Sequence, residues 1–126
     1  MIGVKDKSVL RELTEVPSHP ILLDVIDFIL ERYPDITFTS GYRAGDPGVH
    51  GTIPCRGRDI RSAGIPDPEN VAAWINMHWR YDPARPTRLV AVYHRVKKPD
   101  GSWGGRHFHI QVHPNTIHTG IAVGRI

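Results

Sequence analysis

The stretch Arg106-His-Phe-His-Ile-Gln-Val-His113 decides the fold class of this chain. Its apolar and polar residues alternate strictly, which predicts a half-buried β-strand. The period of two puts the apolar residues on one face and four polar ones on the other, namely His107, His109, Gln111 and His113. A row of imidazoles on one sheet face favours metal binding, because neutral imidazole is the commonest zinc ligand and a strand fixes its direction. A solvated face that merely tolerates histidines is the alternative.

A helix is expected before this strand, near the N-terminus. Apolar residues recur at helical spacing between Ile21 and Leu30, and we expect Ser18 to cap this helix, because serine favours the N-cap position. The helix should stop near Tyr33, because Pro34 disfavours a helical residue before it.

The rest of the chain alternates between short strands, a loop and one more helix. Strands are expected over residues 36–39, 57–61 and 88–94, and a glycine- and proline-rich loop over 42–54. A second helix should start at Asp67-Pro68-Glu69, with Asp67 as its N-cap, and end near Tyr81. This order predicts a compact α+β domain with a small antiparallel sheet flanked by helices, and it excludes a helical bundle.

Length and composition predict one globular domain. The chain has 126 residues, of which 40% are hydrophobic and 23% charged, close to the averages for globular proteins. The single cysteine excludes a disulfide framework and a four-cysteine zinc finger. We expect residues 1–17 to form an N-terminal arm or a short helix and residues 18–126 to form the single domain.

Charge and hydropathy indicate which classes of partner this protein has and whether it enters a membrane. The formal charge of +3 is modest and the basic residues are scattered along the sequence, so we expect no nucleic-acid partner. The longest apolar stretch, residues 21–30, is too short to cross a bilayer, so we expect no membrane span. No apolar segment of a signal peptide follows the N-terminus, which indicates synthesis in the cytoplasm without a secretory signal.

Three side chains in separate segments form a candidate metal site. His50 lies in the glycine-rich loop, Asp59 on the strand that follows it, and a third ligand can come from the histidines of the last strand. Three protein ligands are the number expected for a catalytic zinc ion, whose fourth position stays open for water. His94, in the predicted strand 88–94, can face the same groove.

The order of three motifs resembles a known family. Ser40-Gly-Tyr-Arg43 is followed by His50 and Asp59, and then by His107-Phe-His109. This order is similar to that of the zinc D-alanyl-D-alanine peptidases, which include murein endopeptidases and phage endolysins and share their fold with the hedgehog signalling domain. The resemblance spans roughly residues 36–113.

The resemblance implies a function and a role for each site residue. It implies a zinc-dependent peptidase that hydrolyses peptide stems or cross-links of bacterial peptidoglycan, acting as a monomer on the cell wall and encoded by a bacterium or a phage. The implied zinc ligands are His50, Asp59 and His109. The implied catalytic residues are Arg43, which would hold a carboxylate or oxyanion, and His107, which would handle protons. The candidate substrate-binding residues are Ser40, Tyr42 and Trp103.

Two departures from the family pattern keep an alternative open. The spacing from His50 to Asp59 is two residues longer than in the commonest form. Many members also carry a catalytic Glu three residues before the last ligand, where this chain has Arg106. The murein endopeptidase branch uses histidines instead, but one of these corresponds to Gly104 here. The alternative is therefore a catalytically impaired zinc-binding member that serves as a binding or structural module.

A third possibility is a nuclease of the type that binds a metal through a His-hydrophobe-His strand. Residues 107–109 fit the metal-binding part of such a nuclease site. Its nucleophilic tyrosine usually follows on a helix, whereas no tyrosine occurs after Tyr93. The sequence therefore favours the peptidase over the nuclease.

Overall fold

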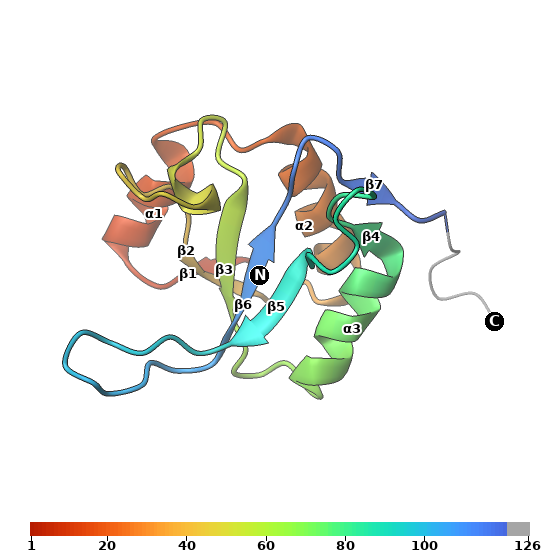
Figure 1. The fold of residues 1–126 in the computed structure, drawn as a ribbon. Coiled ribbons are helices and arrows are strands. Elements are labelled where there is room, and N and C mark those ends of the chain that lie inside the picture. The colour runs from red at the N-terminus through yellow and green to blue at the C-terminus, as the bar shows by residue number, and fades with distance from the viewer. Residues whose placement is uncertain (121–126) are drawn as a thin grey trace.

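Five strands form the main sheet within residues 1–120, the part of the chain that the structure describes (Figure 1). In this computed structural model the spatial order is β1 (Gly3–Val4), β2 (Thr37–Ser40), β3 (Gly57–Arg61), β6 (His107–Gln111) and β5 (Ala91–His94). β1 and β2 are parallel, and every other pairing in this sheet is antiparallel. The predicted small antiparallel sheet is confirmed, with one short parallel strand added at its edge. Residues 121–126 of the predicted domain lie outside the described part.

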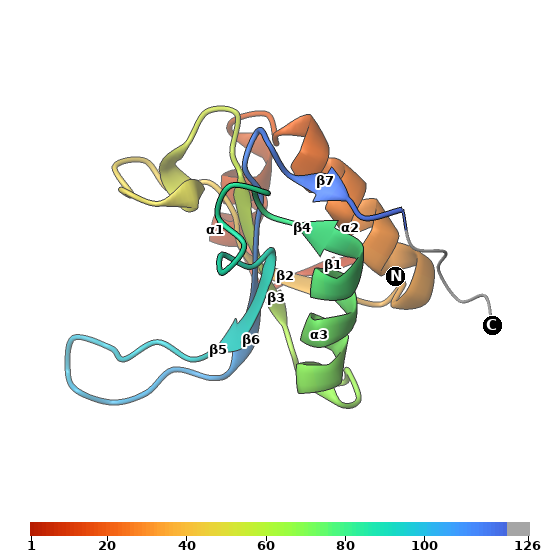
Figure 2. The same cartoon turned by 45° about the vertical axis from the view of Figure 1, so that its right-hand side comes forward.

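Helices cover one face of the sheet and one of its edges. Figure 2 shows α2 (Pro20–Arg32) and α3 (Pro68–His78) on the same side of the sheet, while α1 (Lys7–Thr14) contacts β1 and β2. β4 (Trp79–Arg80) and β7 (Ile117–His118) form a separate two-stranded pair. The described residues thus form the predicted α+β arrangement of a sheet and helices. None of the helices within residues 1–120 combines the length and hydrophobicity needed to cross a bilayer.

The hydrophobic core fills the space between the sheet and α2 and α3. Phe108 and Ile110 of β6 point into it together with Ile60 of β3, and all three are almost completely buried. Leu22 and Ile75 meet them from the two helices. Burying a side chain of this size contributes about 1.5–3 kcal/mol. Because one face of these strands packs against the core, the register of β3 and β6 turns Asp59, His107 and His109 to the opposite face.

The N-cap of α2 is His19 and not Ser18, which corrects the prediction. The His19 Nδ1 accepts a hydrogen bond from the Ile21 backbone N–H at 3.1 Å. Ser18 lies one residue too early for this role, and its Oγ instead accepts a hydrogen bond from Arg58 Nη2 at 2.7 Å. The end of the helix is as predicted, with Tyr33 as the C-cap.

The second predicted helix is shorter than expected. α3 ends at His78, because Trp79 adopts an extended conformation and pairs with His118 of β7. Asp67 occupies the N-cap position but has a left-handed φ of 48°, and its side chain makes no capping hydrogen bond. The predicted strand 88–94 likewise begins only at Ala91.

Residues 1–17 include a short helix that packs against the sheet. Asp6 caps α1 by accepting a hydrogen bond from the Val9 backbone N–H at 3.0 Å. Val9 is 3% exposed and belongs to the hydrophobic core. This segment therefore contributes to the core and flanks the edge of the sheet beside the candidate site.

Candidate metal centre

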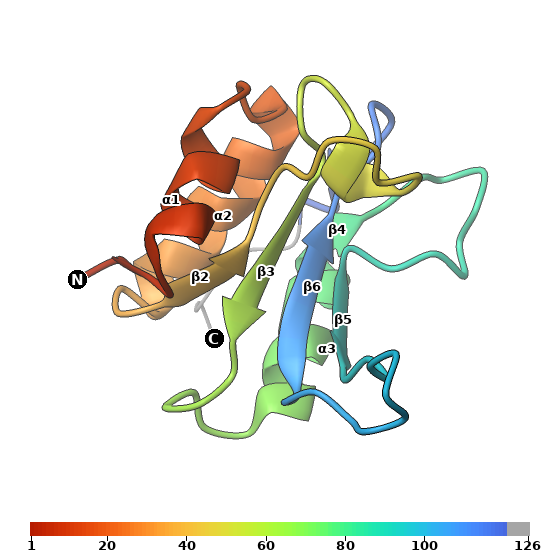
Figure 3. The same ribbon diagram turned by 90° about the vertical axis from the view of Figure 1, so that its left-hand side faces the viewer.

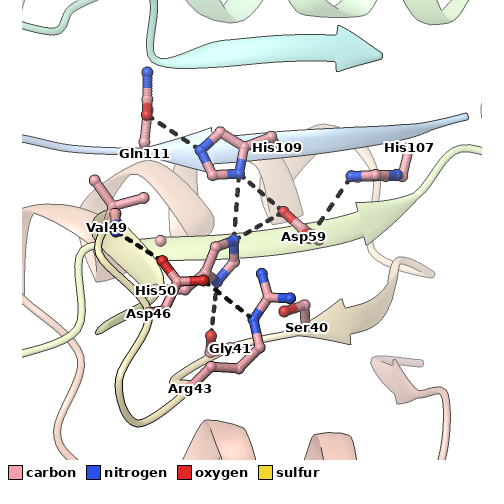
Figure 4. Close-up of polar contacts among 12 residues, drawn as sticks. Ser40, Gly41, Arg43, Asp46, Val49, His50, Asp59, His107, His109 and Gln111 are labelled. Carbon is pink, nitrogen blue, oxygen red and sulfur yellow. Dashed lines mark hydrogen bonds and ion pairs between the residues drawn. The ribbon is translucent and has the colours of Figure 1, made fainter. Parts of the chain in front are cut away.

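Three side chains converge on the face of the sheet opposite α2 and α3. His50 is presented by the 3₁₀ helix η1 (Val49–Gly51), Asp59 by β3 and His109 by β6. Asp59 and His109 are direct register partners, so the pairing of the two strands fixes their spacing. The structure thus brings together the three residues predicted as metal ligands (Figure 4).

The three inward-facing atoms form a nearly equilateral triangle. His50 Nε2 lies 3.3 Å from His109 Nδ1 and 3.3 Å from Asp59 Oδ1, and His109 Nδ1 lies 3.0 Å from Asp59 Oδ1. Ligands at about 2.0–2.1 Å from a tetrahedral zinc ion are separated from one another by about 3.3 Å. The dimensions of the triangle therefore fit three corners of a tetrahedral metal site.

The outward-facing ring nitrogens determine how both imidazoles are protonated. His50 Nδ1 lies 2.7 Å from the carbonyl oxygen of Gly41, and His109 Nε2 lies 3.1 Å from Gln111 Oε1. The Gln111 amide is itself held in place, since its Nε2 donates to the carbonyl oxygen of Leu89 at 2.8 Å. Both partners of the outer nitrogens are oxygen acceptors, so these nitrogens carry the hydrogen of the neutral ring. The inner nitrogens then present lone pairs.

A cation is the group that this arrangement accommodates. Two imidazole lone pairs and a carboxylate oxygen face one another at 3.0–3.3 Å. Three acceptors at such distances repel unless a proton or a metal ion lies between them. His50 is 5% exposed and Asp59 8%, so water reaches them poorly. The group can therefore hold a metal ion, with hydrogen-bonded outer partners of the kind usual around metal-binding histidines.

The carboxyl group of Asp59 is suited to this role. Burial raises its pKa, but without a metal, when a proton on His109 or His50 lies between the groups, the hydrogen bonds and charges of these histidines lower it more. The pKa of Asp59 then falls well below its ordinary value. Asp59 therefore remains ionised at neutral pH, as a metal ligand requires.

Glycines allow the loop that carries His50 to lie close to the sheet. A Cβ atom on Gly51 would lie 1.9 Å from the backbone oxygen of Asp46, and one on Gly57 would lie 2.6 Å from Val49 Cγ2. The Arg43 backbone N–H also donates to the carbonyl oxygen of His50 at 2.8 Å. The conformation of the loop, and with it the position of His50, depends on these close approaches.

Two further histidines extend the group along the same face. His107 Nε2 lies 3.6 Å from Asp59 Oδ2, the carboxylate oxygen that does not belong to the triangle. The ring of His94, which pairs with His107 across the strands, lies 4.9 Å from the His107 ring. Burial, together with the charges of His107 and His109, lowers the pKa of His94. The His94 ring also lies 5.9 Å from the His109 ring, although His94 is not among the described residues that line the groove.

The other predicted site residues occupy different positions. Arg43 and Ser40 line a groove that also reaches Asp59 and His107. Ser40 Oγ donates to Glu12 Oε1 at 3.3 Å. Figure 4 shows the Arg43 side chain beside the metal ligands, with its Nε 3.9 Å from Asp46 Oδ2.

Tyr42 and Trp103 are not among the described residues that line this groove. The Tyr42 backbone N–H donates to the Glu12 carbonyl oxygen. Trp103 is 51% exposed on the loop between β5 and β6, where the Arg95 guanidinium lies 4.6 Å from its ring centroid. Their role in substrate binding remains a prediction.

The partners that orient the ligands were missed by sequence reasoning. Gln111 carried a signal, because it shares the strand face of the histidines. The Gly41 carbonyl oxygen carried none, since every residue has a backbone carbonyl.

Replacing Gln111 by leucine should weaken metal binding by about 10- to 100-fold, because His109 loses the acceptor that fixes its tautomer. Competition titration of the purified protein with a chromophoric zinc chelator measures this change. Replacing Asn115 by leucine provides a control at an exposed residue outside the ligand group. An unchanged affinity in the Gln111 variant would show that the Gln111 amide does not tune the site.

Comparisons with protein-family models, curated proteins and solved structures found no match to this chain. Functional inference therefore depends on the motifs and on the geometry of the site.

Proposed function

We propose that this protein is a zinc-dependent peptidase that hydrolyses peptide stems or cross-links of bacterial peptidoglycan, with the fold of the D-alanyl-D-alanine peptidases. The observation that carries the proposal is the triangle of His50 Nε2, Asp59 Oδ1 and His109 Nδ1, whose outer nitrogens both face oxygen acceptors. The order of these ligands after the Ser40-Gly-Tyr-Arg43 motif adds support from the sequence. We place its action on the cell wall, as for an endolysin.

In this mechanism zinc, when bound, supplies a Lewis acid and lowers the pKa of a coordinated water to about 7. His107 is positioned to accept a proton at Nε2, because its Nδ1 lies 3.3 Å from the carbonyl oxygen of Gly105 and can donate to it. Arg43 can hold a substrate carboxylate or a developing oxyanion, since its guanidinium stays charged and presents forked donors. Asp59 and the two histidine ligands stay fixed throughout.

A peptidoglycan digest tests the proposal. The protein loaded with one equivalent of zinc should release peptides from purified peptidoglycan, and mass spectrometry of the products identifies the bond that is cut. Treatment with a chelator should stop the release and added zinc should restore it. A zinc-loaded protein that releases no peptide from several peptidoglycan chemotypes would contradict the proposal.

One observation favours a second candidate, a zinc-binding module without peptidase activity. Arg106 occupies the place of the acid that serves as the base in many family members, and Glu12, the acid of α1 that lines the groove, accepts hydrogen bonds from Ser40 and Gly41. Retention of zinc together with binding to peptidoglycan, but without cleavage, is the result that this candidate predicts.

A further inference from the structure

An open groove of about 990 Å³ runs from the metal centre toward the end of the sheet where β3 ends and β6 begins. Asp59 and His107 line it together with Arg43. Figure 3 shows this face of the sheet, with the loops after β3 and β5 at its lower end. The groove is therefore continuous with the candidate site.

Positive charge predominates along the groove. The six basic residues that line it come from five separate segments of the chain: Lys5, Arg43, Arg61, Lys97, Lys98 and Arg106. Among its lining residues, the acidic ones are Glu12 and Asp59. Glu12 accepts hydrogen bonds from Ser40 and Gly41, and Asp59 belongs to the ligand group. Basic residues that look scattered in the sequence are thus gathered in the fold beside the metal centre.

Among these cations, Arg61 lies on the same strand as the candidate ligand Asp59 and close to it. It follows Asp59 by two residues on β3 and pairs with His107 of β6, so it lies on the same face of the sheet as both. Its side chain is exposed, and Lys97 and Lys98 are exposed on the loop between β5 and β6. A guanidinium at this place can bind a carboxylate with two parallel hydrogen bonds, while the lysines act as point charges.

We propose that the groove binds an acidic peptide segment, and that Arg61, Lys97 and Lys98 select peptides with free carboxylates over their amidated counterparts. The inference rests on the proposed peptidase function, because it assigns this groove to the same peptide whose bond lies at the metal. The inference is based on charge complementarity. Six cations line the groove, and its two acidic residues, Glu12 and Asp59, already have partners within the protein.

The aromatic residues near the groove favour a peptide over a nucleic acid. Binding of single-stranded nucleic acid uses aromatic rings on which bases stack. Tyr93, which lines the groove, already packs against the Phe108 ring at 5.2 Å and has the Arg106 guanidinium 5.7 Å from its centroid. Arg95 and Lys97 lie 4.6 and 5.8 Å from the ring centroid of Trp103. A cationic side chain of the protein therefore already lies near each ring, where a base would have to stack.

Binding of a matched pair of peptides tests the inference. The probes are N-acetyl-L-alanyl-γ-D-glutamyl-Nε-acetyl-L-lysyl-D-alanine with both carboxylates free, which is acidic, and the same peptide with both amidated, which is neutral. Each is titrated calorimetrically into the zinc-loaded protein. We expect the free acid to bind about tenfold more tightly at low salt, and the difference to shrink at high salt. In the triple variant Arg61→Gln, Lys97→Gln, Lys98→Gln the preference should fall to about twofold or less.

Three exposed cations outside the groove provide a control with the same loss of charge. The variant Lys7→Gln, Arg11→Gln, Arg80→Gln should keep the preference of the wild type. Equal affinities for the two peptides would overturn the inference. So would a single-stranded oligonucleotide that binds more tightly than the acidic peptide and loses its affinity in the groove variant. A carboxylate preference in a zinc-loaded protein that releases no peptide from several peptidoglycan chemotypes would overturn the proposed function while supporting the groove assignment.

Discussion

Replacing Asp59 by alanine should lower the zinc content of the purified protein from about one ion per chain to about a tenth of that or less. Asp59 supplies the single anionic ligand of the group, and without it two neutral imidazoles remain. The stabilisation by zinc should disappear with it, since a thousandfold excess over the Kd stabilises a folded protein by about 4 kcal/mol. Elemental analysis and thermal unfolding with and without zinc measure both effects.

Two further variants make this prediction decisive. His50→Ala should show the same loss of zinc, so the result does not depend on how the fold tolerates one substitution. His118→Ala removes an exposed histidine outside the ligand group and should retain zinc. Full zinc occupancy in folded Asp59→Ala and His50→Ala proteins would refute the assignment of the ligands.

Replacing His107 by alanine should lower the turnover of peptidoglycan peptides by about 10²- to 10⁴-fold while zinc is retained. The expected loss follows from the position of His107, whose Nε2 is free to accept a proton 3.6 Å from Asp59 Oδ2 but lies outside the ligand triangle. The measurement combines single-turnover kinetics on a defined stem peptide with elemental analysis of the same preparation.

A histidine just after the strand of His107 supplies a matched control for this prediction. His113 follows β6 and lies near Asp82, with 3.9 Å between its Nδ1 and Asp82 Oδ2. His113→Ala should therefore leave turnover close to that of the wild type. Loss of zinc from the His107 variant would contradict the proposal that His107 accepts a proton and does not bind the metal.

The fold could be predicted where one physical signal dominated. Strict alternation located β6, and the short strand predicted directly after the glycine-rich loop matches β3 at its observed limits, residues 57–61. The predictions were wrong where tertiary contacts decide the outcome. Trp79 could continue α3, but it leaves the helix to pair with β7. Asp67 occupies the predicted N-cap position, but its φ is left-handed and its side chain makes no capping hydrogen bond.

The candidate site also contains some features that the sequence predicted and others that depend on tertiary contacts. The candidate ligands His50, Asp59 and His109, which the structure brings together, were predicted because their residue types and order carry information. The orientation of their rings depends on the Gly41 carbonyl, which His50 meets only when its loop folds back, and on the Gln111 amide, which the Leu89 carbonyl holds from 22 positions away in the sequence. The cationic groove is equally a product of assembly, because its residues lie as far apart in the sequence as Lys5 and Arg106.

Because Asp59 pairs directly with His109, binding of a metal ion at the site would report whether β3 and β6 have paired in the native register. The two residues are 50 positions apart and become neighbours only when β3 and β6 align. A slip of one residue would turn one of them toward the hydrophobic side. Chains in which β3 and β6 are misaligned or unpaired would therefore not bind the ion. During refolding, metal binding would occur only after the two strands have paired in the native register.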